Sequence, residues 1–392
     1  MKLLWASPLP PIRSGISDYA VELLAELATR ATVRVVRPPD WEPGDEWPLN
    51  GEVDLVPTDT MPERGELSLV HLGNNPLHLW LLHRLQAEGS VAVLHDLVLH
   101  HLAVESASVD GGGETLGVML EGAHGEDGRA LAEARRLGMT GARDPFLFPA
   151  RAAFVHSKLA AVVVHSSWAQ GRVQLEFPEI PCGRIGLPAA DPGSVNRNRL
   201  RDELGWSPEE VVLMHIGFMT PEKGVHEVLG GLAAARRCGV NARLVLVGQG
   251  LGFDTIRSVA ADLGLGDHES CTGWVESSDF PQLPSAADLG IVLRTPTAGE
   301  TSAAAVRFLA CGTPVAVVGV RQFLELPERA APRITPGASA AADVARLLAS
   351  VGDRSDEWAE RRRAARAAYD AEHRPEDSAE DLLAFLETVA IS

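Results

Sequence analysis

Short apolar segments alternate with longer amphipathic segments along the whole chain, and this alternation constrains the fold more than any other feature. Strands are predicted at 3–6, 32–36, 67–72, 91–94 and 161–165, and in the second half at 211–216, 243–247, 289–293 and 314–318. Helices are predicted at 17–29, 77–86 and 168–176, and in the second half at 225–238, 253–263, 301–310 and 338–350. Strands that alternate with helices are typical of parallel sheets with crossover helices, so we predict an α/β fold with a doubly wound sheet in each half.

The length of 392 residues exceeds the size of a typical single core, so two domains are expected. A turn-rich passage at 186–193 separates the halves and predicts domains at 1–187 and 188–372. Within the first domain, residues 103–150 lack strand signals and are expected to form helices and loops over one edge. The C-terminal stretch 358–389 is helical by its periodicity, with an interruption near Pro375, and 373–392 is expected to form the C-terminal helix.

Composition excludes several classes of function. A formal net charge of -18 argues against a nucleic-acid binder and weighs against docking on anionic lipid. No apolar run approaches the roughly 20 residues that a membrane span requires. The cysteines have neither metal-type spacing nor a disulfide framework, which fits a reducing compartment: they are Cys182, Cys238, Cys271 and Cys311. We therefore expect a cytoplasmic protein without stable membrane insertion, and its oligomeric state stays open.

The most informative segment for function runs from Arg294 to Pro314. It follows a predicted buried strand, forms a loop, enters a helix at about Thr301 and leads into the next strand. Open α/β sheets bind ligands at such positions, because strand ends and free helix amides meet there. Glu300, at the predicted helix start, has two interpretations: a cap favoured by the helix dipole, or a group that recognises a ligand.

Other strand ends in the second half also carry glycine or polar residues. Gly217 follows one strand and is followed by Lys223 just before a helix, which suits a diphosphate. The alternative is an ordinary turn with a solvated lysine. Gly248 repeats the glycine at a neighbouring strand end, and Gly273 and Trp274 follow another. Together these turns favour a nucleotide site on the second domain.

The first domain begins with a long loop between its first strand and first helix. Arg13 and Gly15 lie in this loop, and Gly15 would let backbone amides approach a ligand. Ser17 or Asp18 is predicted to cap the helix that follows.

Histidines follow several strands of the first domain. His95 and Asp96 come directly after a buried strand, where sites of such folds form, so we predict a functional His95. His100 comes about one turn later, His165 is interpreted as part of a structural turn, and His71 ends a further strand.

These residues together match a known family. The chain resembles the retaining glycosyltransferases of the GT-B fold, in glycosyltransferase family 4 (glycosyl transferases group 1), over nearly its whole length. The resemblance rests on the Glu300 loop with Ala-Cys-Gly-Thr-Pro-Val at 310–315, on Gly217 and Lys223-Gly224, on Val247-Gly248 and on Thr272-Gly-Trp. It implies two Rossmann-like domains that face a central cleft, with the nucleotide-sugar donor on the second and the acceptor on the first. It also implies that the C-terminal helix crosses back to the first domain.

The resemblance also implies roles for individual residues. His95, Lys223 and Glu300 would be catalytic, with Lys223 on the phosphates, His95 beside the donor sugar and Glu300 as the first member of a glutamate pair. The implied donor-binding residues are Gly15, Gly217, Lys223, Gly248, Trp274, Val275, Arg294, Glu300, Thr301, Ser302 and Arg307. The predicted acceptor-binding residues are Arg13, Asp96, His100 and Asn74.

Two positions depart from the family pattern. Phe218 stands where the family often has an arginine, and Arg307 stands where it usually has the second glutamate, one residue early. An arginine cannot accept hydrogen bonds from ribose hydroxyls. We expect Arg307 or Arg294 to supply the missing positive charge. The alternative is an ion pair of Arg307 with Glu300, two turns apart on one helix face.

The function implied is transfer of a sugar, with retention, from a nucleotide-diphosphate donor to a hydroxyl of a small molecule or glycan. Neither a metal nor another cofactor is expected, because helix dipoles and basic side chains would neutralise the leaving diphosphate. The alternatives are another GT-B enzyme, such as a nucleotide-sugar epimerase or a phosphorylase, and a non-catalytic nucleotide-binding protein. An epimerase would consume the donor without an acceptor, and a phosphorylase would require phosphate.

Overall fold

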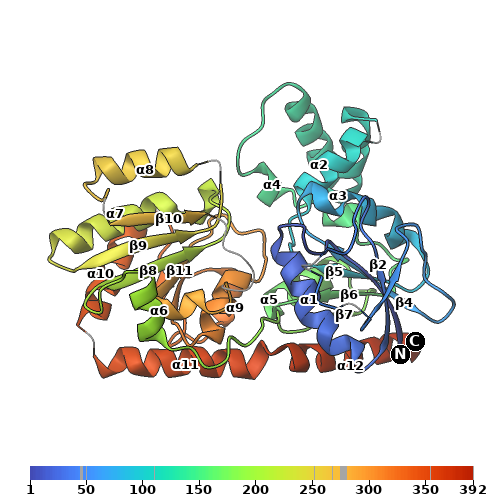
Figure 1. The fold of residues 1–392 in the computed structure, drawn as a ribbon. Coiled ribbons are helices and arrows are strands. Elements are labelled where there is room, and N and C mark those ends of the chain that lie inside the picture. The colour runs from blue at the N-terminus through green and yellow to red at the C-terminus, as the bar shows by residue number, and fades with distance from the viewer. Residues whose placement is uncertain are drawn as a thin grey trace. The chain divides into compact units, whose positions relative to one another are not determined.

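The computed structural model describes residues 1–44, 47–49, 51–109, 111–250, 252–266, 268–273, 280–353 and 355–391. Its contacts divide the chain into two compact units (Figure 1). Unit 1 comprises Met1–Pro188, Ala298–Thr301 and Pro375–Ser392, and unit 2 comprises Ala189–Thr297 and Ser302–Arg374. Each unit has its own sheet, in which every pair of neighbouring strands among the described residues is parallel. Each unit is thus Rossmann-like, a parallel sheet with crossover helices.

The sheet of unit 1 has the strand order β3-β2-β1-β4-β5-β6-β7. Its strands are β1 (Lys2–Ala6), β2 (Thr32–Val36), β3 (Asp54–Val56), β4 (Leu67–Leu72), β5 (Ser90–Leu94), β6 (Ala161–Val164) and β7 (Cys182–Arg184). The central strands β4, β5 and β6 are buried along their whole length, as continuous apolar runs in a parallel sheet should be. The edge strands β3 and β7 were not predicted, because each is short and partly polar.

The helices of unit 1 cover both faces of this sheet. They are α1 (Gly15–Ala28), η1 (Pro76–Gln86), α2 (His100–Val109), α3 (Gly113–Arg136), α4 (Asp144–Leu147), η2 (Arg151–Ala153), α5 (Ser167–Glu176) and α12 (Pro375–Ile391). The segment predicted as a helix at 77–86 is a 3₁₀-helix, η1. The predicted cap of α1 is wrong: Ser14 caps the helix by accepting a hydrogen bond from the amide of Ile16 at 3.2 Å, while Ser17 is buried inside it.

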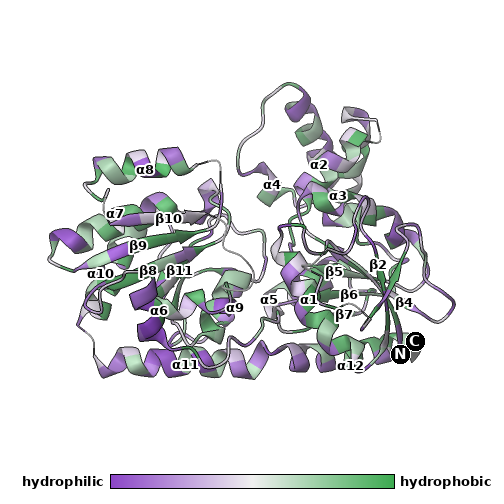
Figure 2. Cartoon of the chain, viewed as in Figure 1, coloured by the Kyte–Doolittle hydropathy of each residue, from purple (hydrophilic) through white to green (hydrophobic). Residues whose placement is uncertain are grey.

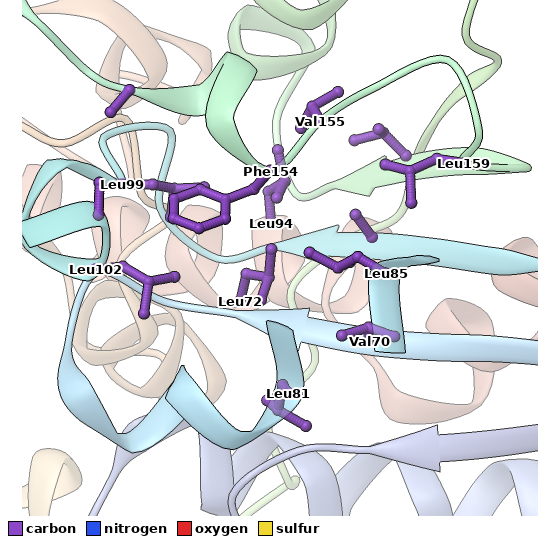
Figure 3. Close-up of a cluster of buried hydrophobic side chains, with 14 of the residues drawn as sticks. Val70, Leu72, Leu81, Leu85, Leu94, Leu99, Leu102, Phe154, Val155 and Leu159 are labelled. Carbon is purple, nitrogen blue, oxygen red and sulfur yellow. The ribbon is translucent and has the colours of Figure 1, made fainter. Parts of the chain in front are cut away.

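The core of unit 1 fills the space between the sheet and η1, α2 and α5. Figure 3 shows part of it, with Phe154 beside Leu94 and Leu99. On the other face, α12 packs against α1 and β7. A Cβ added at Gly183 of β7 would lie 2.5 Å from the ring of Phe385, so α12 can approach this strand only at a glycine. The C-terminal helix therefore belongs to the unit that contains the N-terminus.

The sheet of unit 2 has the strand order β10-β9-β8-β11-β12-β13. Its strands are β8 (Val211–Ile216), β9 (Ala242–Val247), β10 (Glu269–Gly273), β11 (Leu289–Val292), β12 (Val315–Val318) and β13 (Arg333–Ile334). Its helices are α6 (Arg197–Glu203), η3 (Pro221–Lys223), α7 (Val225–Arg237), α8 (Phe253–Asp262), η4 (Leu283–Ala286), α9 (Ala303–Ala310), η5 (Arg321–Glu325), α10 (Ala340–Gly352) and α11 (Asp356–Glu372). Of the edge strands, β10 was predicted only by its end at Gly273, and β13 was not predicted.

Hydropathy separates the inside of each unit from its surface. The strands of both sheets are largely hydrophobic, whereas α11 is largely hydrophilic (Figure 2). Only Trp358, Ala365 and Tyr369 of α11 are buried, at a spacing that places them on one side of the helix. Within the described residues, no helix combines the length and the apolar character that a membrane span requires.

Candidate functional site

In unit 2, the turns after β8 and β9 lie against each other. The amide of Gly217 donates to the carbonyl of Val247 at 2.9 Å, and the amide of Met219 donates to that of Gln249 at 2.8 Å. Gly248 has a φ of 134°, and a Cβ added there would overlap the carbonyl oxygen of Gly217. The glycine at this strand end is therefore required by the contact between the two turns, independently of any ligand.

Lys223 folds back over the end of β8. It ends η3, and Gly224, with a φ of 64° in the left-handed region, then turns the chain into α7. The Nζ atom of Lys223 lies 2.9 Å from the position that a Cβ of Gly217 would take. A larger residue at 217 would therefore displace the ammonium group, and the binding of a diphosphate by these two residues stays a prediction.

The ring of His215, one strand residue before this turn, stays neutral. Its Nδ1–H donates to the carbonyl of Ile291 at 3.0 Å. Burial, and secondarily the charge of Lys223, lowers the pKa of His215 to about 3. Lys223 thus lies near a neutral, fully buried ring rather than a second cation.

The helix α9 begins later than predicted. Ser302 is its N-cap, and the Oγ of Ser302 accepts from the amide of Ala305 at 3.3 Å. The interpretation of Glu300 as the helix cap is therefore wrong. Since Glu300 precedes the helix, it does not share a helix face with Arg307, so the predicted two-turn geometry of an ion pair between them is wrong as well.

The two arginines predicted to supply the second positive charge, Arg307 and Arg294, lie on different elements of unit 2 and differ in burial. Arg307 is buried on α9, with its guanidinium carbon 5.1 Å from the ring centroid of Phe280. Arg294 follows β11 and is partly buried. The next amide, that of Thr295, donates to the carbonyl of Glu222 at 2.9 Å, which joins this loop to η3. Phe218 remains 48% exposed.

The segment Ala298–Thr301 belongs to unit 1, which the sequence did not predict. The carbonyl of Ala298 accepts from the amides of Leu97 and Val98 at 2.8 and 3.1 Å. The hydroxyl of Thr301 donates to the carbonyl of His165 at 3.1 Å. Glu300, between these anchors, is 8% exposed. The structure therefore places Glu300 in the same unit as His95.

Three neighbouring strands of unit 1 end in histidines whose rings lie together. His71 is in β4, His95 follows β5 and His165 follows β6. Nδ1 of His71 lies 3.1 Å from Nε2 of His95, and the ring centroids of His95 and His165 are 5.0 Å apart. The ring of Tyr19, from α1, lies 4.7 Å from that of His95 and 5.3 Å from that of His165. We call these four residues the ring cluster.

Burial keeps three members of the ring cluster, His71, His95 and Tyr19, uncharged. It lowers the pKa of His71 and of His95 well below the ordinary histidine value, and a positive charge on His165 would lower both further. Burial also raises the pKa of Tyr19, so its phenol keeps its proton. These three residues thus offer neutral hydrogen-bonding groups.

Asn74, Asp96 and His100, which were predicted to bind the acceptor, are close in sequence to His71 and His95. The side-chain oxygen of Asn74 accepts from the backbone amides of His101 and Leu102 at 2.8 and 3.3 Å, and the backbone amide of Asn74 donates to the carboxylate of Asp96 at 2.9 Å. His100 is buried, and its Nδ1–H donates to the carbonyl of Phe148 at 2.9 Å. Asn74 and His100 thus stabilise the start of α2, and their contact with an acceptor stays a prediction.

Arg13 and Gly15 are exposed. A Cβ added at Gly15 would meet no described atom within 4 Å, so glycine is not required there for packing. Trp274 and Val275 lie outside the described residues. Among those that are described, no group of His, Cys, Asp or Glu side chains is arranged to hold a metal ion.

Sequence reasoning missed Tyr19 and His71 as neighbours of His95 and interpreted His165 only as part of a turn. The signal was present, since each histidine occupies the end of an apolar strand. The sequence alone does not give the strand order β4-β5-β6, and it is this order that places the three strand ends side by side.

Comparison with known proteins identifies the class to which this fold belongs. Residues 196–369 match the family model for glycosyl transferases group 1, a range that contains the whole sheet of unit 2. Over 99% of this chain and all of the other, the structure resembles that of Anabaena Alr3699/HepE in complex with UDP and glucose, with a TM-score of 0.66 and 17% sequence identity. A sucrose-phosphate synthase from Thermosynechococcus elongatus matches with a TM-score of 0.68 and 18% identity over the full length of both chains.

Curated relatives match a shorter part of the chain. A GDP-mannose-dependent alpha-(1-6)-phosphatidylinositol monomannoside mannosyltransferase of Mycobacterium tuberculosis is 34% identical over 130 residues, which are 32% of this chain and 33% of that protein. A 2-deoxystreptamine glucosyltransferase of Streptomyces kanamyceticus is 26% identical over 166 residues, 42% of each chain. The chain thus spans about a third to two fifths of the length of these relatives. The protein has the GT-B fold, and its residues 196–369 are similar to the glycosyl transferases group 1.

Proposed function

We propose that the protein is a glycosyltransferase that moves a sugar from a nucleotide-diphosphate donor to an acceptor hydroxyl, with retention at the anomeric carbon and without a metal. The observation that carries this proposal is the ammonium group of Lys223 over Gly217, at the strand ends of the group 1 region. A cation fixed beside two glycine turns suits a diphosphate, which needs both charge and close backbone approach.

The proposed step breaks the bond between the anomeric carbon and the diphosphate oxygen and forms a bond from that carbon to the acceptor oxygen. The acceptor attacks from the side that the diphosphate leaves, and the proton of its hydroxyl passes to a diphosphate oxygen. Negative charge therefore grows on the leaving group, where Lys223 would stabilise it, with Arg307 or Arg294 as the second cation. No side-chain nucleophile and no cofactor takes part in this course.

The neutral groups of unit 1 suit the sugar better than the phosphates. His95, at the partly exposed edge of the ring cluster, would hydrogen-bond a hydroxyl of the donor sugar. Glu300, anchored by its neighbours Ala298 and Thr301, would accept from other hydroxyls. The relatives and structural neighbours include proteins named for mannosyl and glucosyl transfer and structures with UDP, so we propose a hexose as the sugar.

The first experiment identifies the nucleotide. Thermal unfolding is measured with UDP, GDP, ADP and dTDP, since a ligand at about 100 times its Kd stabilises the folded state by about 2.7 kcal/mol. One nucleotide should raise Tm well above the others, and the effect should be lost in Lys223→Ala but kept in Lys158→Ala, where the lysine is exposed in unit 1.

The second experiment tests the reaction. The corresponding nucleotide sugars are incubated with a panel of acceptor alcohols, with and without EDTA, and the anomeric configuration of the product is read by NMR. Retention, unchanged by EDTA, supports the proposal. Inversion would overturn the proposed retention, and loss of turnover with EDTA would overturn the independence of metal. Donor consumption that needs no acceptor would overturn the proposed transfer.

A further inference from the structure

The ring of His95 is hydrogen-bonded to the ring of His71: Nδ1 of His71 lies 3.1 Å from Nε2 of His95. His71 is fully buried, and its ring lies 4.0 Å, between centroids, from that of Trp5. Only one of the two facing nitrogens can carry the proton when both rings are neutral. The position of that proton decides what the other edge of His95 presents to a ligand.

The second nitrogen of His71 indicates where its proton lies. Among the described residues, Nε2 of His71 is buried without a hydrogen-bond partner. The hydroxyl of Tyr19 is also buried without one, and the two rings are 5.6 Å apart. A proton on Nε2 of His71 would therefore leave two buried donors near each other without an acceptor, which is costly. A proton on Nδ1 avoids this and is used in the bond to His95.

A hydrogen bond from His78 also fixes the backbone of His71. Nδ1 of His78 lies 2.9 Å from the carbonyl oxygen of His71, and because a carbonyl only accepts, His78 carries its proton on Nδ1. Burial lowers the pKa of His78 to about 4, so this ring is neutral as well. His78 thus anchors the strand end from which the ring of His71 reaches His95.

We infer that His71 is a positioning residue that donates from Nδ1 to Nε2 of His95 and so holds His95 in the tautomer with its proton on Nδ1. His95 is partly exposed, unlike the fully buried His71. His95 then presents an N–H donor to its ligand. The inference rests on the proposed function only for what the ligand is: an oxygen of the donor sugar.

The tautomer is tested without turnover. The full chain is labelled with ¹⁵N-histidine, and two-bond ¹H–¹⁵N spectra are compared for the wild type and His95→Gln, which assigns His95. The wild type should show His95 with a protonated Nδ1 and a bare Nε2 near neutral pH. A protonated Nε2 on His95 would overturn the inference whether or not the protein transfers sugars.

Two substitutions of His71 separate hydrogen bonding from packing. His71→Asn keeps an N–H close to the position of Nδ1, whereas His71→Leu keeps only the volume. The Leu variant should lose the single tautomer of His95 and lower kcat about tenfold, with a smaller change in KM, as expected for one lost hydrogen bond. The Asn variant should stay within about threefold of the wild type.

A purely structural role for His71 predicts the opposite order. An apolar leucine in a fully buried position would then be tolerated better than a polar asparagine. Thermal unfolding of both variants shows whether each is folded, and the spectra report on His95 in each. If the wild type turns over no donor, the proposed function fails while the spectra still decide the tautomer.

Discussion

The strand ends of the two sheets differ in chemistry although both units are built on parallel α/β scaffolds. In unit 1 the ends of β4, β5 and β6 hold histidine rings that lie together, and burial keeps those of His71 and His95 neutral. In unit 2 the ends of β8 and β9 hold two tightly packed glycine turns with the ammonium of Lys223 above them. One scaffold thus presents neutral hydrogen-bonding groups and the other a positive charge. Under the proposed function, these suit sugar hydroxyls and a diphosphate respectively.

The largest effect is expected when the positive charge of Lys223 is removed from unit 2. Lys223→Ala should lower kcat about 100- to 1000-fold, because a group that stabilises charge on the leaving group contributes mainly in the transition state. Steady-state kinetics with the identified donor measures this. Lys158→Ala removes an exposed lysine of unit 1 and should leave kcat unchanged. Equal effects of the two substitutions would show that overall charge, not the site in unit 2, is responsible.

The glycine turns of unit 2 are tested through stability. Gly248→Ala should destabilise unit 2 by about 3 kcal/mol, since the added Cβ would overlap the carbonyl of Gly217 at a φ of 134°. Urea unfolding gives the change. Gly252→Ala is the matched control, because its φ is -96° and an added Cβ meets no described atom within 4 Å. If both variants were equally stable, the close contact between the two turns would be wrong.

Acid should destabilise both units through their buried histidines. Folding lowers the pKa of His78 in unit 1 from 6.5 to about 4 and that of His215 in unit 2 to about 3. Between these values the unfolded chain binds more protons, so stability is complete above about pH 6.5 and falls as the pH falls. For His78 alone the loss between pH 7 and pH 5 is about 2 kcal/mol.

Scanning calorimetry across this pH range measures the effect. His78→Asn and His215→Asn should each reduce the pH dependence of unfolding, while His226→Asn, at an exposed position of α7, should not. A wild-type Tm that stays constant from pH 7 to pH 5 would contradict the burial of neutral rings in both sheets.

In both units the sequence predicted the central strands better than the edge strands. The central strands were predicted in both, because continuous apolar runs are distinctive, whereas edge strands such as Cys182–Arg184 and Arg333–Ile334 are too short and too polar to be recognised. The proximity of Gly217 and Lys223 was predictable, since both lie in one strand–turn–helix segment. The short sequence separation of Gly217 and Lys223 largely determines the distance between them.

The ring cluster and the Ala298–Thr301 segment depend on tertiary structure. His71 and His95 are 24 positions apart, and only the strand order brings them together. Ala298 to Thr301 lies between elements of unit 2 in the chain, and its small residues gave no local sign of contacts with Leu97 and Trp168. The start of α9 was displaced for a related reason: the chain stays extended at Ser302 and leaves Glu300 outside the helix.

The smallest expected effect concerns that start. Ser302→Ala should destabilise the protein by about 1 kcal/mol, because the hydroxyl accepts from the amide of Ala305 and alanine leaves that amide without its cap. Ser339 is the matched control in the same unit: it precedes α10, and within the described chain its side chain makes no capping bond, so Ser339→Ala should cost a few tenths of a kcal/mol at most. Urea unfolding of the two variants gives the difference directly. If Ser302→Ala instead matched Ser339→Ala in stability but lowered turnover, Ser302 would act on the ligand rather than as a cap. The ligand site at the strand ends of unit 2 would then include the start of α9.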